Sequence, residues 1–98
     1  MSKFTAWLNQ KPVLVADGAT GTMLQKAGLK PGAAPERWNL ENAAAVRALY
    51  KAYIDAGADM ILTNTFGGTP VRLERDGLRE QVHAVNLAAA RLAREVAD

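Results

Sequence analysis

Six residues near the N-terminus, 17–22, combine a carboxylate with small and hydroxyl side chains in the order Asp-Gly-Ala-Thr-Gly-Thr. Their glycines let the backbone approach a ligand closely. The N–H groups after Asp17 open a predicted helix and favour a negatively charged partner. The carboxylate of Asp17 could hold the ammonium group of an amino acid while these N–H groups hold its carboxylate. The candidate binding residues are therefore Asp17, Gly18, Ala19 and Thr20.

A simpler interpretation of the same residues is that Asp17 caps a helix and the glycines only form a turn. The spacing is neither the GxGxxG motif nor the P-loop, so it does not imply a nucleotide.

A second polar loop follows another apolar run and supplies the candidate residues Thr63, Asn64, Thr65 and Phe66. Three consecutive hydrogen-bonding side chains need partners if they are buried at a strand end, and Phe66 could form a pocket wall. In parallel α/β folds, ligands bind beyond the carboxyl ends of the strands, where both loops are expected. The alternative is an ordinary polar turn with a buried Phe66.

Three further residues each have a structural and a functional interpretation. Trp38 lies before a long predicted helix and either packs in the core or forms a ligand-facing wall. His83, the single histidine, is expected at the surface or at a helix cap rather than in a catalytic or metal site. Asn86 interrupts an apolar stripe and is expected to be partly buried, with hydrogen bonds to neighbouring backbone.

Two apolar runs, 13–16 and 60–63, do not alternate apolar with polar residues, which predicts parallel strands buried on both faces. Between them, apolar residues recur at helical spacing over 46–54. Asn42 is the predicted N-cap of this helix, and Gly57 supplies the residue at which it ends.

Similar spacing predicts a second long helix over 82–96 and a shorter one over 22–27, closed by Gly28. Residues 30–39 contain two prolines and a glycine and are expected to form an ordered loop. An N-terminal helix is expected to cover one end of the sheet with the apolar side chains Phe4, Trp7 and Leu8.

The order strand, helix, strand, helix predicts an α/β fold with a right-handed crossover between parallel strands. A two-stranded sheet is only marginally stable, since three or more strands are normally needed. We therefore expect the 98 residues to be the opening part of a larger α/β domain, or a chain that obtains further strands in an oligomer.

Composition excludes several functions. The net charge is +2 and the basic residues are scattered among acids, which is not the footprint of a nucleic-acid-binding protein. The longest apolar run is too short to span a bilayer, and no signal-peptide pattern is present, so a cytoplasmic protein without membrane partners is expected. Without cysteine, the chain has neither disulfides nor a Cys-based zinc site.

Four segments, taken in order, resemble the homocysteine S-methyltransferase family. Residues 17–22 resemble its DGAxGT opening, 38–42 its WNLEN segment and 57–67 its GAD-I--TNTFG segment. Residues 85–95 resemble its helix with the pattern LNxAAxxLARE. The likeness covers about residues 12–98, and the bacterial members that use betaine look most similar.

The resemblance implies a (β/α)8 TIM barrel, with residues 1–98 as a partial homocysteine-binding domain truncated after its second helix. It implies transfer of a methyl group to homocysteine, giving methionine, from betaine, S-methylmethionine or methyltetrahydrofolate. The residue matching Asp17 holds the homocysteine amino group, and the following backbone helps to hold its carboxylate. The segment matching 63–67 borders the methyl-transfer site, and Trp38 approaches the donor.

The resemblance also implies a zinc ion bound by three cysteines on later strands, none of which this chain contains. We therefore assign no catalytic or metal-binding residue here and expect the isolated chain to be inactive without the missing barrel half or another chain. The alternatives are a non-catalytic α/β module that assembles through an open sheet edge, and a different barrel enzyme with an amino-acid or phosphate pocket.

Overall fold

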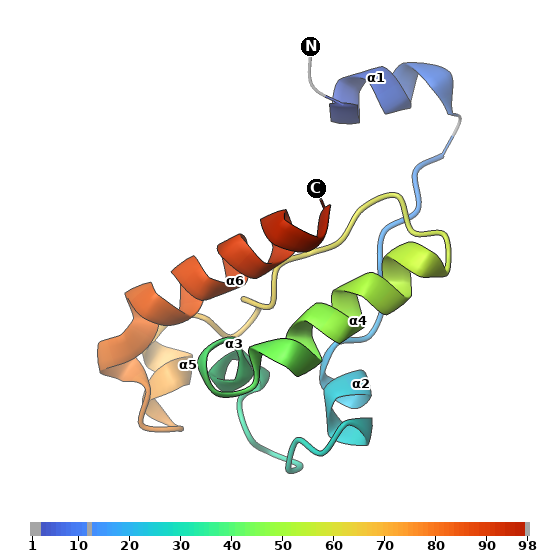
Figure 1. Cartoon of the computed structure of the whole chain (residues 1–98). Helices are drawn as coiled ribbons and strands as arrows, with labels where there is room; N and C mark the ends of the chain where they lie inside the picture. The colour runs from blue at the N-terminus through green and yellow to red at the C-terminus, as the bar shows by residue number, and fades with distance from the viewer. Residues whose placement is uncertain (1–2, 12, 98) are drawn as a thin grey trace.

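Two long helices, α4 (Ala43–Asp55) and α6 (Val82–Ala97), lie side by side and run in the same direction at the centre of the molecule (Figure 1). The structure is a computed structural model that describes residues 3–11 and 13–97. The apolar stripes of both helices contribute to one buried cluster, which contains Val46, Tyr50, Leu92 and Ala93. Both long helices were predicted from their periodicity, and both predictions are confirmed.

The two ends of α4 follow the expected local chemistry. The side chain of Asn42 accepts a hydrogen bond from the backbone N–H of Ala45 at 3.3 Å, which satisfies one of the free donors of the first turn. Gly57 has a φ of +109°, a left-handed conformation that few other residues adopt. The predicted cap and the predicted end are therefore both confirmed.

A second buried cluster joins the short helix α2 (Gly21–Lys26) to α4 and consists of Leu24, Leu29 and Leu49. Gly28 ends the turn after α2 with a φ of +116°, as predicted. Trp38 packs against both this cluster and the cluster between α4 and α6.

The segment expected as a loop over 30–39 is shorter than predicted. Residues 30–34 are irregular, but a 3₁₀ turn η1 (Pro35–Arg37) leads directly into helix α3 (Trp38–Glu41). Proline suits the first position of η1 because that position has no hydrogen-bond acceptor for an N–H group. Two further elements were not predicted, and these are α5 (Pro70–Glu74) and η2 (Arg79–Gln81).

The prediction of parallel strands, and with it the strand–helix–strand–helix portion of a (β/α)8 TIM barrel, is wrong for this structure. No strand is formed within residues 3–11 and 13–97, which are mainly helical. The segments 13–16 and 60–63 run parallel but meet only at one isolated bridge, between Ala16 and Met60.

The carboxylates beside this bridge explain why the ladder stops there. The N–H of Asp17 donates to the carbonyl of Met60 at 3.0 Å. A continued parallel ladder would next use the N–H of Leu62, but this group donates to the side-chain Oδ2 of Asp17 at 3.1 Å. On the other side, the N–H of Val15 donates to Oδ2 of Asp59 at 3.0 Å. Side chains thus occupy backbone donors that further ladder bonds would use, and no strand within 3–11 and 13–97 covers the two segments.

Helix α1 (Lys3–Gln10) forms as predicted but does not cover a sheet. Figure 1 shows it set apart from the other helices at the end of an extended segment. Phe4 and Leu8 are about half exposed, at 49% and 51%. The expected packing of these side chains as a lid is therefore wrong, since the described part of the chain forms no sheet that they could cover.

Candidate functional site

The loop that follows Leu62 is held in place by a buried asparagine. Asn64 is 4% exposed, and its backbone N–H donates to the hydroxyl of Tyr50 at 2.7 Å. Its side-chain Nδ2 donates to the carbonyl of Pro35 and to Oδ1 of Asn39, both at 2.9 Å. The candidate residue Asn64 therefore points toward α3 and η1, which it fastens to the loop.

The neighbouring candidates in this loop are less buried than Asn64, since Thr63 and Phe66 are exposed and Thr65 is half-buried. The hydroxyl groups of Thr63 and Thr65 form a hydrogen bond with each other at 2.8 Å. Phe66 is fully exposed, so the alternative of a turn with a buried Phe66 is wrong. The loop closes with a hydrogen bond from the N–H of Gly68 to the carbonyl of Thr65 at 2.9 Å.

The first candidate loop is fixed by α4 and by the second apolar segment. Tyr53 donates its hydroxyl to the carbonyl of Ala19 at 2.7 Å, and a Cβ on Gly18 would lie 3.2 Å from that hydroxyl oxygen. Asp17 accepts from the N–H of Leu62, and the N-cap of α2 is Thr20, which makes no side-chain capping bond. The alternative that Asp17 caps this helix is therefore wrong.

A cavity of about 420 Å³ lies between the two candidate loops. It brings together five predicted site residues, namely Thr20, Thr63, Asn64, Thr65 and Phe66. Asp17, Gly18, Ala19 and Trp38 are not among its lining residues. The structure thus joins the second loop to the end of the first, and the predicted ammonium-binding carboxylate lies outside the cavity.

Sequence reasoning missed Glu36 and Arg72, which both line this cavity. Glu36 is only 4% exposed, and its Oε2 accepts a hydrogen bond from the N–H of Gly67 at 3.0 Å. A Cβ on Gly67 would lie 3.0 Å from Oε1 of Glu36, so a glycine there leaves room for the carboxylate. Nothing in the sequence distinguishes Glu36 from a solvated acid, because its burial arises from the fold of η1 against the 64–68 loop.

Trp38, His83 and Asn86 do not line this cavity. Trp38 packs between the two buried clusters, as its structural interpretation predicts. His83 is exposed on α6. Asn86 is half-buried and donates to the carbonyls of Gly68 and Val82, both at 2.8 Å. The expectation that Asn86 bonds neighbouring backbone is therefore confirmed.

Burial controls the ionisation of Tyr50 beside the site. Desolvation raises the pKa of the Tyr50 hydroxyl, and the nearby charge of Asp17 raises it further. The hydrogen bond from the N–H of Asn64 lowers this pKa but does not cancel the effect of burial. Tyr50 is therefore neutral at physiological pH and serves the loop as a hydrogen-bond acceptor.

The described residues offer no group of three or more His, Cys, Asp or Glu side chains that could hold a metal ion. The zinc that the family resemblance implies therefore does not fit the residues described here. Within the same residues, no helix is long and apolar enough to cross a membrane.

Comparison with known proteins identifies the family. Residues 14–98 match the family model described as homocysteine S-methyltransferase. The chain is 38% identical over 92 residues to the S-methylmethionine–homocysteine S-methyltransferase BHMT2 of Rattus norvegicus, covering 93% of this chain and 24% of the relative.

A solved structure agrees with this match. The metallated form of the homocysteine methyltransferase MmuM from Escherichia coli resembles the chain with a TM-score of 0.82 and 29% identity. The likeness covers 93% of this chain and 33% of that one. These matches place the chain among the methyltransferases. It belongs to the homocysteine S-methyltransferase family, and it spans 24% of the first relative and 33% of the second.

Proposed function

We propose that this chain forms part of the substrate site of an enzyme that methylates homocysteine, with betaine or a similar small molecule as the methyl donor. The observation that carries the proposal is the family match over residues 14–98 together with the cavity lined by both candidate loops. The match supports the reaction class, and the cavity offers the substrates a place beside Thr20 and the loop of Thr63–Phe66.

The reaction is a transfer of one methyl group between two heteroatoms. The sulfur of homocysteine forms a bond to the methyl carbon while the bond from that carbon to the donor nitrogen breaks. The bonding electron pair stays on the nitrogen, and the thiol proton passes to solvent. The products are methionine and the demethylated amine.

The binding roles proposed for this chain concern homocysteine, which accepts the methyl group, and the edge of the methyl-transfer site. Asp17 would hold the ammonium of homocysteine, since its carboxylate has one oxygen that is not used by the N–H of Leu62. The backbone N–H groups of residues 18–20 would hold the homocysteine carboxylate. Thr63 and Thr65 would border the transfer site, because both line the cavity.

A zinc ion, if the enzyme uses one, would need ligands from further polypeptide, because this chain has no cysteine. Further polypeptide is also consistent with the share of the two relatives that the chain does not match. We therefore propose that the 98-residue chain alone does not transfer methyl groups.

The test is a chimera in which this chain replaces the matching third of the E. coli enzyme MmuM. Homocysteine and a donor with a ¹³C-labelled methyl group are supplied, and labelled methionine is followed by NMR. We expect the chimera to form methionine and the 98-residue chain to form none. The Asp17→Ala chimera should bind homocysteine at least tenfold more weakly. A folded chimera that binds no homocysteine would contradict the proposal.

The exposed apolar residues near the single bridge favour one second candidate, a non-catalytic module that assembles with other chains. Val13, Val15 and Leu62 are 69%, 53% and 66% exposed. Extended segments with unpaired backbone groups and apolar side chains readily pair with another chain. Sedimentation of the purified chain tests this candidate, which requires a discrete oligomer at micromolar concentration rather than a monomer.

A further inference from the structure

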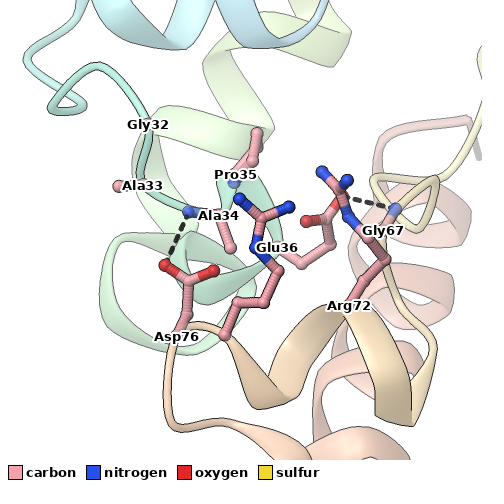
Figure 2. A pocket seen from close by; sticks show the side chains of 9 residues that line it. Gly32, Ala33, Ala34, Pro35, Glu36, Gly67, Arg72 and Asp76 are labelled. Carbon is pink, nitrogen blue, oxygen red and sulfur yellow. Dashed lines mark hydrogen bonds between the residues drawn. The ribbon is translucent and has the colours of Figure 1, made fainter.

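Two arginines on one face of α5 line a second, smaller cavity. Arg72 lies within α5 and Arg75 caps its C-terminal end, so their three-residue spacing places both on the same side. The cavity is about 140 Å³ and lies between α5 and residues 32–36. Figure 2 shows Arg72 reaching toward Gly67 from α5, across from the loop that carries Ala34. The volume is about ten times the ~10–15 Å³ that one water molecule needs.

Neither guanidinium of this pair has a hydrogen bond or an ion pair with another described residue. Three other arginines of the chain do have a carboxylate partner, and these pairs are Arg37–Glu41, Arg47–Glu95 and Arg79–Glu74. Arg72 and Arg75 are thus two neighbouring cations with donors to spare, directed at one cavity. A guanidinium matches a carboxylate in shape and charge and binds it through paired hydrogen bonds.

The two carboxylates that line the cavity, those of Asp76 and Glu36, each accept a hydrogen bond from a backbone N–H group. Oδ1 of Asp76 accepts from the N–H of Ala34 at 3.3 Å, and Oε2 of Glu36 accepts from the N–H of Gly67 at 3.0 Å. Figure 2 draws both bonds as dashed lines. With two arginines and two acids, the lining has no formal net charge, and no ion pair is formed among these four side chains. Such a lining suits a ligand that carries both a carboxylate and a cationic group.

The small cavity adjoins the candidate site. Pro35, Glu36, Gly67 and Arg72 line both cavities, so Glu36 and Arg72 stand at the boundary between them. A ligand whose carboxylate lies at the arginines can direct its cationic end past Glu36 toward the loop of Thr63–Gly67.

We propose that Arg72, Arg75 and Glu36 form a subsite for a small zwitterion, with the carboxylate at the two arginines and the cationic group at Glu36. Assigning this zwitterion as the methyl donor rests on the proposed function above. The subsite would select donors that carry a carboxylate and would exclude a purely cationic methyl donor.

The experiment is an NMR titration of the ¹⁵N-labelled 98-residue chain with betaine, choline, acetate, inorganic phosphate and homocysteine. We expect betaine to shift the amide signals of Ala34 and Gly67, and to bind at least tenfold more tightly than choline or acetate. Arg72→Gln and Arg75→Gln should each weaken betaine binding at least fivefold. Arg91→Gln, an exposed arginine on α6 that lines neither cavity, should leave it unchanged.

Several results would overturn the subsite. Equal binding of choline and betaine would remove the role of the arginines, and tighter binding of phosphate than of betaine would make this an oxyanion site. Displacement of betaine by homocysteine at the same amides would assign the subsite to the acceptor. If betaine binds as expected but the chimera forms no methionine, the zwitterion subsite stands and the proposed methyl transfer fails.

Discussion

Asn39 and Asn64 hydrogen-bond to each other in both directions. Nδ2 of Asn64 donates to Oδ1 of Asn39, and Nδ2 of Asn39 donates to the backbone carbonyl of Asn64, both at 2.9 Å. Asn39 also donates to the carbonyl of Val85 at 3.2 Å, so a single side chain connects α3, the site loop and α6. Both asparagines are almost fully buried, at 3% and 4% exposed.

Replacing Asn39 with alanine should therefore destabilise the fold strongly. The variant leaves the buried carbonyl of Asn64 without this donor and removes one acceptor of its Nδ2, and an unsatisfied buried group costs about 1–3 kcal/mol. We expect Asn39→Ala to lower the free energy of unfolding by about 1–3 kcal/mol. Urea denaturation followed by circular dichroism measures this change. Gln25→Ala, an exposed position on α2, is the control and should change stability by less than about 0.5 kcal/mol.

Gly68 should not tolerate a side chain, because of contacts rather than backbone strain. A Cβ at this position would lie 2.7 Å from Oδ1 of Asn86 and 3.1 Å from the backbone carbonyl of Thr65. Asn86 could turn away only by giving up its bonds to α6 and to the loop. We expect Gly68→Ala to cost about 1–3 kcal/mol, the usual range for overpacking.

The matched control for this substitution is Gly21→Ala at the start of α2. The nearest atom to its Cβ would be 4.0 Å away, and alanine favours helix over glycine. Thermal unfolding should therefore show a lower midpoint for Gly68→Ala and an unchanged or higher one for Gly21→Ala. Equal midpoints for the two variants would show that the contact with Asn86 is not restrictive.

The helices could be predicted from the sequence because their determinants are local. In α4, the apolar spacing from Val46 to Ile54, the cap at Asn42 and the turn at Gly57 all lie within one short segment. The strands could not be predicted in the same way, because a ladder requires partners from elsewhere in the chain. Asp17 and Asp59 take up backbone donors beside the one bridge, and no periodicity reveals this.

Only part of the candidate site could be predicted, because the burial of a polar side chain depends on contacts between distant segments. Polar residues after an apolar run identified Thr63–Phe66 and Thr20, which do line the larger cavity. Glu36 could not be found, since a glutamate in a Pro-rich stretch is usually solvated and only the folded loop buries it. Asp17 was singled out by sequence, but its role as an ammonium ligand stays a prediction.

Tyr50 should make the protein sensitive to alkaline pH. Burial raises the pKa of its hydroxyl above the ordinary value near 10, so the unfolded chain loses this proton first as the pH rises. The contribution of Tyr50 to stability is fully present below about pH 10 and is lost as the pH rises toward its folded pKa. The Tyr50→Phe variant removes this dependence but leaves the N–H of Asn64 without an acceptor, at a cost of about 1–3 kcal/mol. Chemical denaturation at a series of pH values up to 11 should show both effects, and Tyr53→Phe, whose hydroxyl bonds an exposed carbonyl, should show a smaller loss.

Asp59 should make the junction between α1 and the rest of the chain sensitive to acid. The side chain of Lys11 lowers the pKa of the Asp59 carboxyl most, followed by the N–H of Val15. A lowered pKa means that the unfolded chain binds the proton first as the pH falls. The stabilisation is therefore present above the ordinary value of 3.8 and is lost as the pH falls below it, toward the folded pKa.

The change that isolates this effect is Asp59→Asn, which removes the charge while keeping the shape of the side chain. We expect the wild-type amide of Val15 to exchange faster with solvent below pH 4, after correction for the intrinsic rate, and the Asp59→Asn variant to show no such step. Asp55→Asn is the control, because the ion pair of Asp55 with Lys51 joins two exposed side chains one helical turn apart and such pairs contribute little. If the faster exchange of the Val15 amide below pH 4 disappears in Asp55→Asn, or persists in Asp59→Asn, another carboxylate governs this junction.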